Sequence, residues 1–354
     1  MTMVSEVEKF YKNKRVFITG HTGFKGTWLC HFLHQLNCKI GGFSIESFDF
    51  FTASECDHYV QSYIGDVRDY TALSQAIQHF QPQILFHLAA QPLVLESFNN
   101  PTYTYSTNVM GTINLLEIVR HCSSIQAIVV ITTDKVYEDN VTLWGYRETD
   151  TLGGHDPYSN SKACCEIVVS GYRKSFLSES DIRIATARAG NVIGGGDFSE
   201  NRIIPDCVQA TKKGKRIPIR NPHHIRPWQH VLDPLWGYLL LAKALWEKVA
   251  HFHAYNFGPE RKNCISVNRL VSLFCKKWGE DVSAEVIHTP NQHESKYLKL
   301  DSSLALEDLN WLPSWNVEQA IDACIEWYKM DFSIIRMHEF MNCQIKKYMS
   351  NIKQ

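Results

Sequence analysis

Short apolar runs alternate with helical patterns from the start of the chain, and this alternation is the main signal of its fold. One strand-like run comes just before Gly20, and another ends near Ile64. Further runs lie at residues 39–44, 84–88, 127–131 and 183–187. Between them, apolar positions at helical spacing predict helices at residues 28–36, 101–121 and 158–176. Continuous apolar runs are typical of parallel strands buried on both faces. We therefore expect an α/β fold with a doubly wound parallel sheet and right-handed crossovers.

The pattern changes after residue 188. Three consecutive glycines at 194–196 indicate a loop rather than a strand. Further helices are predicted at residues 234–249, 267–278 and 319–328, and we expect the amphipathic tail after Phe332 to pack on the surface. The sequence therefore predicts a change of architecture near residue 188.

A glycine motif joins the first predicted strand to the first helix. Glycines in this position let the backbone turn tightly and approach a pyrophosphate, which the helix N-terminus stabilises. An ordinary strand-to-helix turn is the alternative, but the position between strand and helix favours a Rossmann-type dinucleotide site. His21 and Lys25 would lie beside the pyrophosphate, with an effect on affinity of either sign. The cofactor-binding residues expected here are Gly20, Thr22, Gly23, Phe24, Lys25 and Gly26.

Later loops at the same edge of the sheet supply further cofactor candidates. Glu46, about 20 residues beyond the glycines, is either a ribose ligand that favours NAD over NADP or a loop acid in solvent. Asp66 either accepts from the adenine amino group or caps a helix. The remaining cofactor candidates are Val67, Leu88, Ala89, Ala90, Gln91 and Asn108.

Two polar stretches carry the candidate chemistry. Thr133, Asp134 and Lys135 follow the apolar run 127–131, where polar groups face a ligand crevice. Tyr158 and Lys162 are four residues apart, so on a helix they share a face and the ammonium could lower the pKa of the phenol. A solvated surface pair is the alternative for the tyrosine and lysine. Their position downstream of the glycine motif favours the catalytic interpretation.

Arginines gather in the second half of the chain. Arg202, Arg220 and Arg226 lie close together in the sequence, where they could bind the phosphates of a second ligand. A surface cluster paired with acids is the alternative, although Asp206 and Asp233 are the only acids between residues 201 and 235.

Composition excludes several functions. The 354 residues are 44% hydrophobic, and 36 basic against 37 acidic residues give a net charge of -1, so we expect no nucleic-acid or anionic-membrane partner. No apolar run approaches the roughly 20 residues that span a bilayer. The 11 cysteines contain no Cys-x-x-Cys spacing, so we expect reduced thiols, no metal site and a cytoplasmic location.

Several strings together resemble the extended short-chain dehydrogenase/reductase superfamily. They are GHTGFKG at 20–26, LAAQP at 88–92, TTDK at 132–135, YSNSK at 158–162 and ARAGNVIGGGD at 187–197. Within it, RIIPD at 202–206 and IRPWQHVLDPLWGYLLLA at 225–242 are most similar to the CDP-glucose 4,6-dehydratases. The resemblance spans about residues 14–328. It implies a dinucleotide-binding Rossmann domain at residues 1–188 and mainly a smaller, mixed C-terminal substrate domain at residues 189–354, with the chain crossing between the two. It also implies a lyase that converts CDP-D-glucose to CDP-4-dehydro-6-deoxy-D-glucose and water.

The resemblance implies an internal redox cycle with NAD. Tyr158 would take the proton of the sugar 4-hydroxyl while hydride moves from C4 to NAD, with Lys162 on the nicotinamide ribose and Thr133 on the same sugar oxygen. Lys135 would then remove the C5 proton and Asp134 would protonate the departing 6-hydroxyl. The hydride finally returns to C6, so no net oxidation occurs.

The same resemblance assigns the substrate site and an assembly. Gln91, Thr133, Asn191, Arg202 and Arg226 are expected on the nucleotide-sugar, with the arginines on its phosphates. Dehydratases of thymidine-diphospho-sugars usually have a glutamate where this chain has lysine at 135. Helices near 101–121 and 158–176 would form a homodimer, and the products would feed surface deoxysugars such as those of O-antigen lipopolysaccharide. Leu95 stands where relatives generally have a basic residue, which leaves the hexose open.

Rival functions remain at this point. A nucleotide-sugar 4-epimerase or reductase shares the tyrosine and lysine but lacks the acid and base at 134 and 135. A dehydratase of another nucleotide-hexose and a non-catalytic NAD-binding regulator are the others, and intact Tyr158 and Lys162 argue against the regulator.

Overall fold

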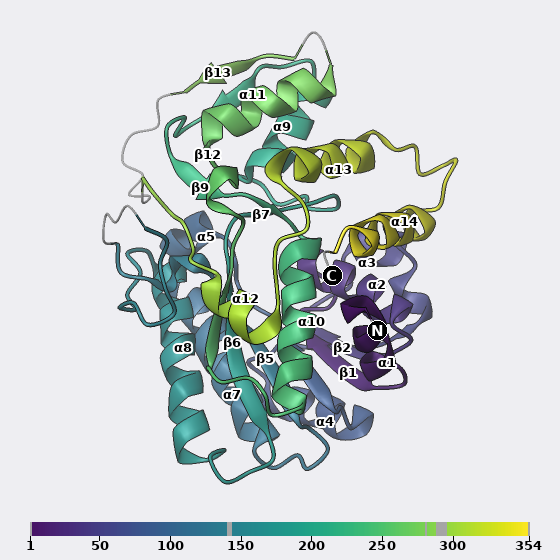
Figure 1. Cartoon of the computed structure of the whole chain (residues 1–354), viewed down its shortest axis with the longest axis vertical. Helices are drawn as coiled ribbons and strands as arrows, with labels where there is room; N and C mark the ends of the chain where they lie inside the picture. Colours follow the sequence, from purple (N-terminus) through teal and green to yellow (C-terminus); the bar gives the residue numbers. More distant parts are fainter. Residues whose placement is uncertain (1, 140–143, 280–281, 288–295, 353–354) are drawn as a thin grey trace.

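A seven-stranded parallel sheet forms the centre of the molecule (Figure 1). The computed structural model describes residues 2–139, 144–279, 282–287 and 296–352. The strand order is β11-β6-β5-β4-β1-β2-β3, which reverses direction beside β1 as in a doubly wound sheet. This confirms the expected fold class. The strands are β1 (Arg15–Thr19), β2 (Lys39–Ser44), β3 (Val60–Ile64), β4 (Ile84–His87), β5 (Ala127–Ile131), β6 (Arg183–Ala189) and β11 (Ala254–Phe257).

Helices cover both faces of this sheet because successive strand residues point to opposite sides. Val129 of β5 packs in the core shared with α2 (Phe24–Gln35) and α10 (Leu232–Trp246). Its neighbour Ile128 packs in the opposite core, shared with α4 (Tyr70–Phe80), α7 (Gly111–Val119) and α8 (Pro157–Ser175). The continuous apolar strands of the sequence therefore bury both faces.

The predicted helix at 101–121 is one continuous helical stretch with an internal irregularity. It begins with α6 (Pro101–Tyr105), passes through a π-helical turn at Ser106–Met110 and continues as α7. The helix predicted at 28–36 begins earlier, at Phe24, because Gly23 already occupies the N-cap position.

The smaller part of the molecule lies beyond the carboxyl ends of the strands (Figure 1). Three two-stranded pairs build it: β7 (Val192–Ile193) with β10 (Gln229–His230), β8 (Ile217–Ile219) with β13 (Ala284–Val286), and β9 (Ile225–Pro227) with β12 (Cys264–Ser266). Its helices are α9 (Ile203–Lys212), α11 (Val267–Trp278) and α13 (Val317–Lys329). The chain returns to the sheet with α10 and β11, the latter pairing parallel to β6. The domain boundary near 188 stays a prediction.

The C-terminal tail forms α14 (Met337–Ser350), an amphipathic helix that packs on the main core. Met341, Ile345 and Tyr348 on its inner face are fully buried, whereas Lys346 and Lys347 are exposed. The Tyr348 hydroxyl donates to Asp233 Oδ1 at 3.0 Å, so the tail is tied to the start of α10. No helix in the described ranges is long and apolar enough to cross a membrane.

Candidate active site

The turn between β1 and α2 has the shape of a pyrophosphate cradle. Gly20 has a φ of +76°, and a Cβ there would lie 2.8 Å from the backbone nitrogen of Ala89. A Cβ at Gly26 would lie 2.1 Å from the carbonyl oxygen of Gly20, so only glycine fits either position. Gly23 caps the twelve-residue helix α2 without a side-chain hydrogen bond, and a Cβ there would meet only Gly20, at 3.5 Å. The amides at the start of α2 are thus open to an anion.

His21 lies elsewhere than expected. Its ring is fully buried under the sheet, where Nε2 contacts Ser62 Oγ at 2.9 Å and Nδ1 contacts Ser44 Oγ at 3.0 Å. A Cβ at Gly42 would collide with this ring at 2.2 Å. The prediction that His21 lies beside the pyrophosphate is wrong, because the histidine turns into the space that Gly42 leaves. Burial lowers its pKa to about 4, so the ring is neutral.

Lys25 lies close to charged groups of the predicted catalytic residues. Burial lowers the pKa of its ammonium to about 8, and the positive charges of Arg202 and Lys162 act in the same direction. Asp134 and Asp197 oppose this shift. Lys25 therefore brings a positive charge from the glycine turn close to Asp134 and Lys162.

Thr22 and Phe24 complete the glycine turn. The Thr22 hydroxyl donates to the carbonyl of Glu46 at 2.7 Å, which ties the turn to the segment after β2. Phe24 lies against Gly194, where an added Cβ would approach its ring at 3.0 Å. The structure therefore brings the glycine turn against the triple-glycine loop of the second half.

The Asp66 carboxylate forms an ion pair with Arg68, Oδ2 to Nη2 at 2.6 Å. That pairing, led by the hydrogen bond from Arg68, lowers the pKa of Asp66. Val67 is buried and packs against Gly111 on α7. The N-cap residue of α4 is Asp69, whose side chain accepts from the amide of Ala72. Asp66 therefore does not cap this helix, and the alternative role suggested for it is filled by Asp69, three residues later.

The loop after β4 is built by internal hydrogen bonds. Leu88, Ala89 and Ala90 are partly buried at the mouth of the glycine turn. Gln91 is buried, and its side-chain nitrogen donates to the Leu93 carbonyl at 3.1 Å and to Thr104 Oγ1 at 2.8 Å. The side chain of Gln91 thus holds its own loop.

Asn108 joins this loop to α8. Its Oδ1 accepts from the amide of Gln91 at 2.8 Å, and its Nδ2 donates to Ser161 Oγ at 2.8 Å. Asn108 is buried, so the structure makes it a support for the cofactor loop.

Thr133, Asp134 and Lys135 form a single tight turn directly after β5. Thr133 is the N-cap of the short helix Asp134–Val136, and its hydroxyl donates to Asp134 Oδ1 at 3.1 Å. Asp134 Oδ2 is buried and makes no hydrogen bond within the described part of the chain. Burial raises the pKa of Asp134 to about 6, against the opposing charges of Lys135, Arg226 and Lys25.

Tyr158 and Lys162 lie in the first turns of α8, as expected. Asp156 caps this helix by accepting from the amide of Ser159, and Pro157 occupies its first position. Lys162 is buried, and its Nζ donates to the Ile131 carbonyl at 3.1 Å. Burial raises the pKa of Tyr158 to about 12, and the hydrogen bond with Thr133 and the charge of Arg202 oppose that rise. The phenol is therefore protonated at neutral pH in the chain by itself, and the expected lowering of its pKa by the Lys162 ammonium is wrong for the chain alone.

Two predicted substrate residues, Arg202 and Arg226, bring their charges close to Tyr158 and Asp134 from the second half of the chain. Arg202 caps α9 and pairs with Asp197 at 2.9 Å, an acid that precedes the 201–235 segment. Arg226 is buried on β9, where its charge lowers the pKa of Asp134. Asn191 is partly buried between β6 and β7, and its carbonyl accepts from the amide of Gln229 at 3.1 Å.

Arg220 pairs with Asp206 at 3.5 Å and binds Asn201 at 2.9 Å. For this arginine the alternative of pairing with acids holds.

Two functional-site residues were missed from the sequence. Glu166 and Arg188 form a buried ion pair behind the Thr133 turn, with 2.8 Å between Arg188 Nη2 and Glu166 Oε2. Glu166 follows Lys162 by four residues, so extending the Tyr158 and Lys162 spacing by one helical turn was the available signal.

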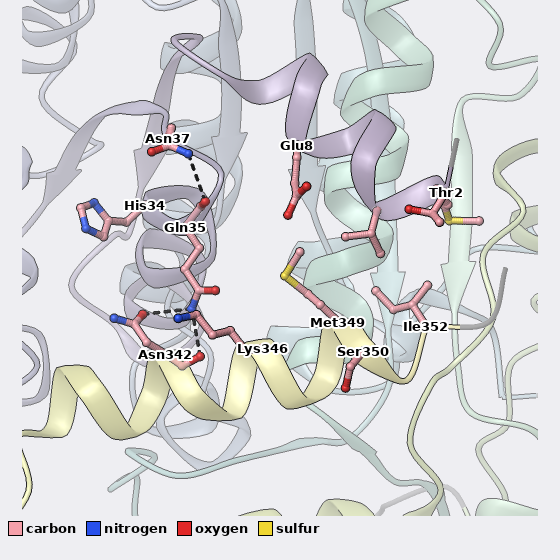
Figure 2. A pocket seen from close by; sticks show the side chains of 12 residues that line it. Thr2, Glu8, His34, Gln35, Asn37, Asn342, Lys346, Met349, Ser350 and Ile352 are labelled. Atoms are coloured by element: carbon pink, nitrogen blue, oxygen red, sulfur yellow. Dashed lines mark hydrogen bonds between the residues drawn. The ribbon is translucent and has the colours of Figure 1, made fainter.

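A cavity of about 630 Å³ lies away from these residues, between α1 (Met3–Tyr11), α2 and α14 (Figure 2). On one side of the cavity, Gln35 Nε2 donates a hydrogen bond to Asn342 Oδ1 at 3.0 Å. Thr2 and Ile352 both line it, so the two ends of the chain meet there. None of the predicted catalytic, cofactor or substrate residues lines this cavity.

The doubly wound sheet, the glycine turn and the tyrosine and lysine one helical turn apart define an extended short-chain dehydrogenase/reductase. The model of the GDP-mannose 4,6 dehydratase family matches residues 17–324, and the chain belongs to that family. It is 42% identical over 355 residues to a CDP-glucose 4,6-dehydratase of Salmonella typhimurium, across 97% of this chain and 98% of the relative.

Solved structures share the fold at lower identity. The dTDP-glucose 4,6-dehydratase of Bacillus anthracis in complex with NAD has a TM-score of 0.77 and 22% identity, covering 93% of this chain and 99% of that one. The UDP-glucose 4-epimerase of Thermotoga maritima with UDP-glucose has a TM-score of 0.78 and 21% identity, covering 89% and 98%. Dehydratases and epimerases thus share this architecture, so the fold by itself does not separate the two activities.

Proposed function

We propose that the chain is an NAD-dependent lyase that converts CDP-D-glucose to CDP-4-dehydro-6-deoxy-D-glucose and water. Membership of a 4,6-dehydratase family and 42% identity to a CDP-glucose 4,6-dehydratase support the reaction class and the substrate. The single observation that carries the proposal is Asp134, a buried carboxyl with a raised pKa and an unbonded oxygen beside Thr133 and Lys135.

The described residues fit a dinucleotide. The open amides at the start of α2 and the close approach of Gly20 to Ala89 suit the pyrophosphate. Lys162 uses one of its three N–H groups on Ile131, which leaves donors for the nicotinamide ribose. The chemistry that bound NAD supplies here is reversible acceptance of a hydride, first from C4 and then back to C6 of the sugar.

Asp134 is suited to be the acid of the elimination. An aspartate in water has lost nearly all its protons at pH 7, whereas a carboxyl with a pKa of about 6 retains roughly a tenth of them. A bound sugar excludes water from the site and raises the protonated fraction further. Asp134 Oδ2 is the atom from which we propose a proton passes to the departing 6-hydroxyl.

The base roles fall to Lys135 and Tyr158. Lys135 is close enough for its charge to lower the pKa of Asp134, so acid and base lie side by side on one turn. We propose that the side-chain nitrogen of Lys135 removes the C5 proton. A hydrogen bond with Thr133 opposes the rise in the pKa of Tyr158, and we propose that both hydroxyls bind the oxygen at C4.

Incubation with CDP-glucose and NAD tests this function. A 4-keto-6-deoxy product develops an ultraviolet absorbance in alkali, and solvent deuterium should appear at C5. UDP-, dTDP- and GDP-hexoses run in parallel identify the nucleotide. Formation of CDP-galactose without loss of water would instead identify a 4-epimerase, and absence of a keto product from every hexose would exclude the dehydratase.

We also propose a homodimer through the surface of α6, α7 and α8. Met110, in the π-helical turn between α6 and α7, and Ile167 on α8 are exposed apolar side chains, 49% and 61% accessible, and a partner copy would cover them. Light scattering should give twice the chain mass, and Ile167→Glu should shift it toward the monomer. A monomer in the unmodified protein contradicts this assembly.

A cytoplasmic location fits the cysteines. All 11 are free thiols, and Cys30, Cys56 and Cys207 are buried. Burial raises the pKa of Cys30 and of Cys207, so these thiols are unreactive packing groups typical of a reducing compartment.

A further inference from the structure

A buried ion pair lies directly behind the turn that carries the proposed acid and base. Glu166 on α8 and Arg188 on β6 have side chains only 4% exposed. Two parallel hydrogen bonds join them, from Nε to Oε1 at 2.9 Å and from Nη2 to Oε2 at 2.8 Å. This forked arrangement restricts the relative orientation of the two groups far more than a single contact does.

The two partners hold opposite ends of the catalytic turn. Thr132, the residue before Thr133, donates its hydroxyl to Glu166 Oε1 at 2.5 Å. Tyr137, two residues after Lys135, accepts from Arg188 Nη1 at 2.8 Å through its hydroxyl oxygen. The three proposed catalytic residues of the turn therefore lie between two anchors of one ion pair.

The same pair fixes the turn relative to α8. Tyr158, Lys162 and Glu166 follow one another at four-residue intervals along one face of that helix. Lys162 binds the carbonyl of Ile131 and Glu166 binds the hydroxyl of Thr132, so α8 is joined to two successive residues at the end of β5.

We propose that Glu166 and Arg188, with Thr132 and Tyr137, form a turn clamp that positions the acid and base against the tyrosine. This inference rests on the proposed function, since it assumes that C4, C5 and C6 of one sugar must be reached together. Glu166 and Arg188 are positioning residues, because they act through the turn. A displacement of about 1 Å in such a site can cost 10²-fold in rate, so the clamp should matter to turnover more than to substrate binding.

The chain offers a matched control for a purely structural role. Thr186 on β6 also donates its hydroxyl to Glu166, to Oε2 at 2.6 Å, but it lies outside the turn. Whether the hydroxyl of Thr186 or that of Thr132 is removed, the Glu166 carboxylate loses one hydroxyl donor. In both cases the ion pair with Arg188 stays intact. Only the loss at Thr132 releases the turn.

Three variants and one rescue variant test the clamp. Thr132→Val and Tyr137→Phe each free one end of the turn, and we expect kcat for the keto product to fall about 10- to 100-fold while KM changes less than about twofold. Thr186→Val should lower the urea midpoint as much as Thr132→Val does while kcat stays within about twofold. Thr132→Ser restores the donor and should recover most of the kcat.

Amide hydrogen exchange gives a readout that needs no substrate. Peptides covering residues 132–138 should exchange faster in Thr132→Val and Tyr137→Phe than in Thr186→Val or the unmodified protein. If the unmodified protein makes no keto product, the proposed function fails while exchange still tests the clamp. Equal kcat losses in all three variants, unchanged kcat in Thr132→Val and Tyr137→Phe, or unchanged exchange in the turn would each overturn the clamp.

Discussion

Asp134 and Asp233 are two buried carboxyls with similar electrostatic properties and different surroundings. Burial raises the pKa of Asp134 to about 6 and that of Asp233 to about 7, and in each the Oδ2 atom makes no hydrogen bond within the described ranges. Cations surround Asp134, and the charges of Lys135, Arg226 and Lys25 all act on it.

Hydrogen bonds, rather than charges, are what oppose burial at Asp233. Its Oδ1 accepts from the amide of Ser314 at 2.7 Å and from the Tyr348 hydroxyl, while its backbone carbonyl accepts from Trp311 Nε1 at 3.1 Å. Asp233 thus links three parts of the chain: α10, the segment that precedes α13, and α14. A raised pKa therefore marks burial in both regions, and only the convergence of charged groups from several segments on Asp134 distinguishes a site of chemistry.

Replacing the acid should produce the largest effect. Asp134→Asn keeps the shape but removes the proton donor, so we expect kcat for the keto product to fall about 10²- to 10⁴-fold with little loss of stability. Asp233→Asn should leave kcat within about threefold. Steady-state kinetics and urea unfolding of both variants check this, and similar activity losses in the two would remove the distinction between the regions.

Removing Lys135, the cation next to Asp134, should further separate the catalytic region from the region around Asp233. Lys135→Ala takes away the proposed base, and we expect deuterium exchange at C5 to fall about 10²-fold. Proton exchange measured by mass spectrometry, together with NAD affinity measured by calorimetry, gives the test. Cofactor affinity should stay within about threefold, and rapid C5 exchange in the variant would contradict the role of Lys135.

The pH dependence of the free energy of unfolding should reveal the raised pKa of Asp233. Because its pKa in the folded state lies above the ordinary value of 3.8, the folded chain binds more protons than the unfolded chain between about pH 4 and 7. Its contribution is therefore present at acidic pH and is lost as pH rises through that window. Asp233→Asn should remove this loss.

Urea midpoints of the two proteins at several pH values check the prediction by their difference. Burial lowers the pKa of His87 and of His230 to about 3, which adds an opposite slope, but both histidines are present in either protein. A difference that does not change with pH would show that Asp233 is ionised in the fold.

The smallest effect should follow from one hydroxyl of the structural region. Tyr348→Phe leaves Asp233 Oδ1 with the amide of Ser314, so we expect a loss of about 1 kcal/mol in the free energy of unfolding and kcat within about twofold. Thermal and urea unfolding measure the first, and the keto-product assay measures the second. A larger kcat loss here than in Thr132→Val would mean that the structural region controls catalysis.

The sequence by itself determined the order of strands and helices, the glycine turn and the tyrosine and lysine on one helix face. These follow from local rules, because apolar runs, helical spacing and glycine conformations depend on neighbouring residues. The same local pattern predicted the Thr133–Asp134–Lys135 turn, since it comes directly after a buried strand.

Only the tertiary structure decided where long-range partners lie. His21 turned under the sheet because Gly42 leaves space for its ring, and the amphipathic tail is tied to α10 because Tyr348 reaches Asp233. The raised pKa of Asp134 and the clamp of Glu166 and Arg188 likewise arise from segments far apart in the chain. Burial and electrostatic coupling depend on distances in space, which no local pattern specifies.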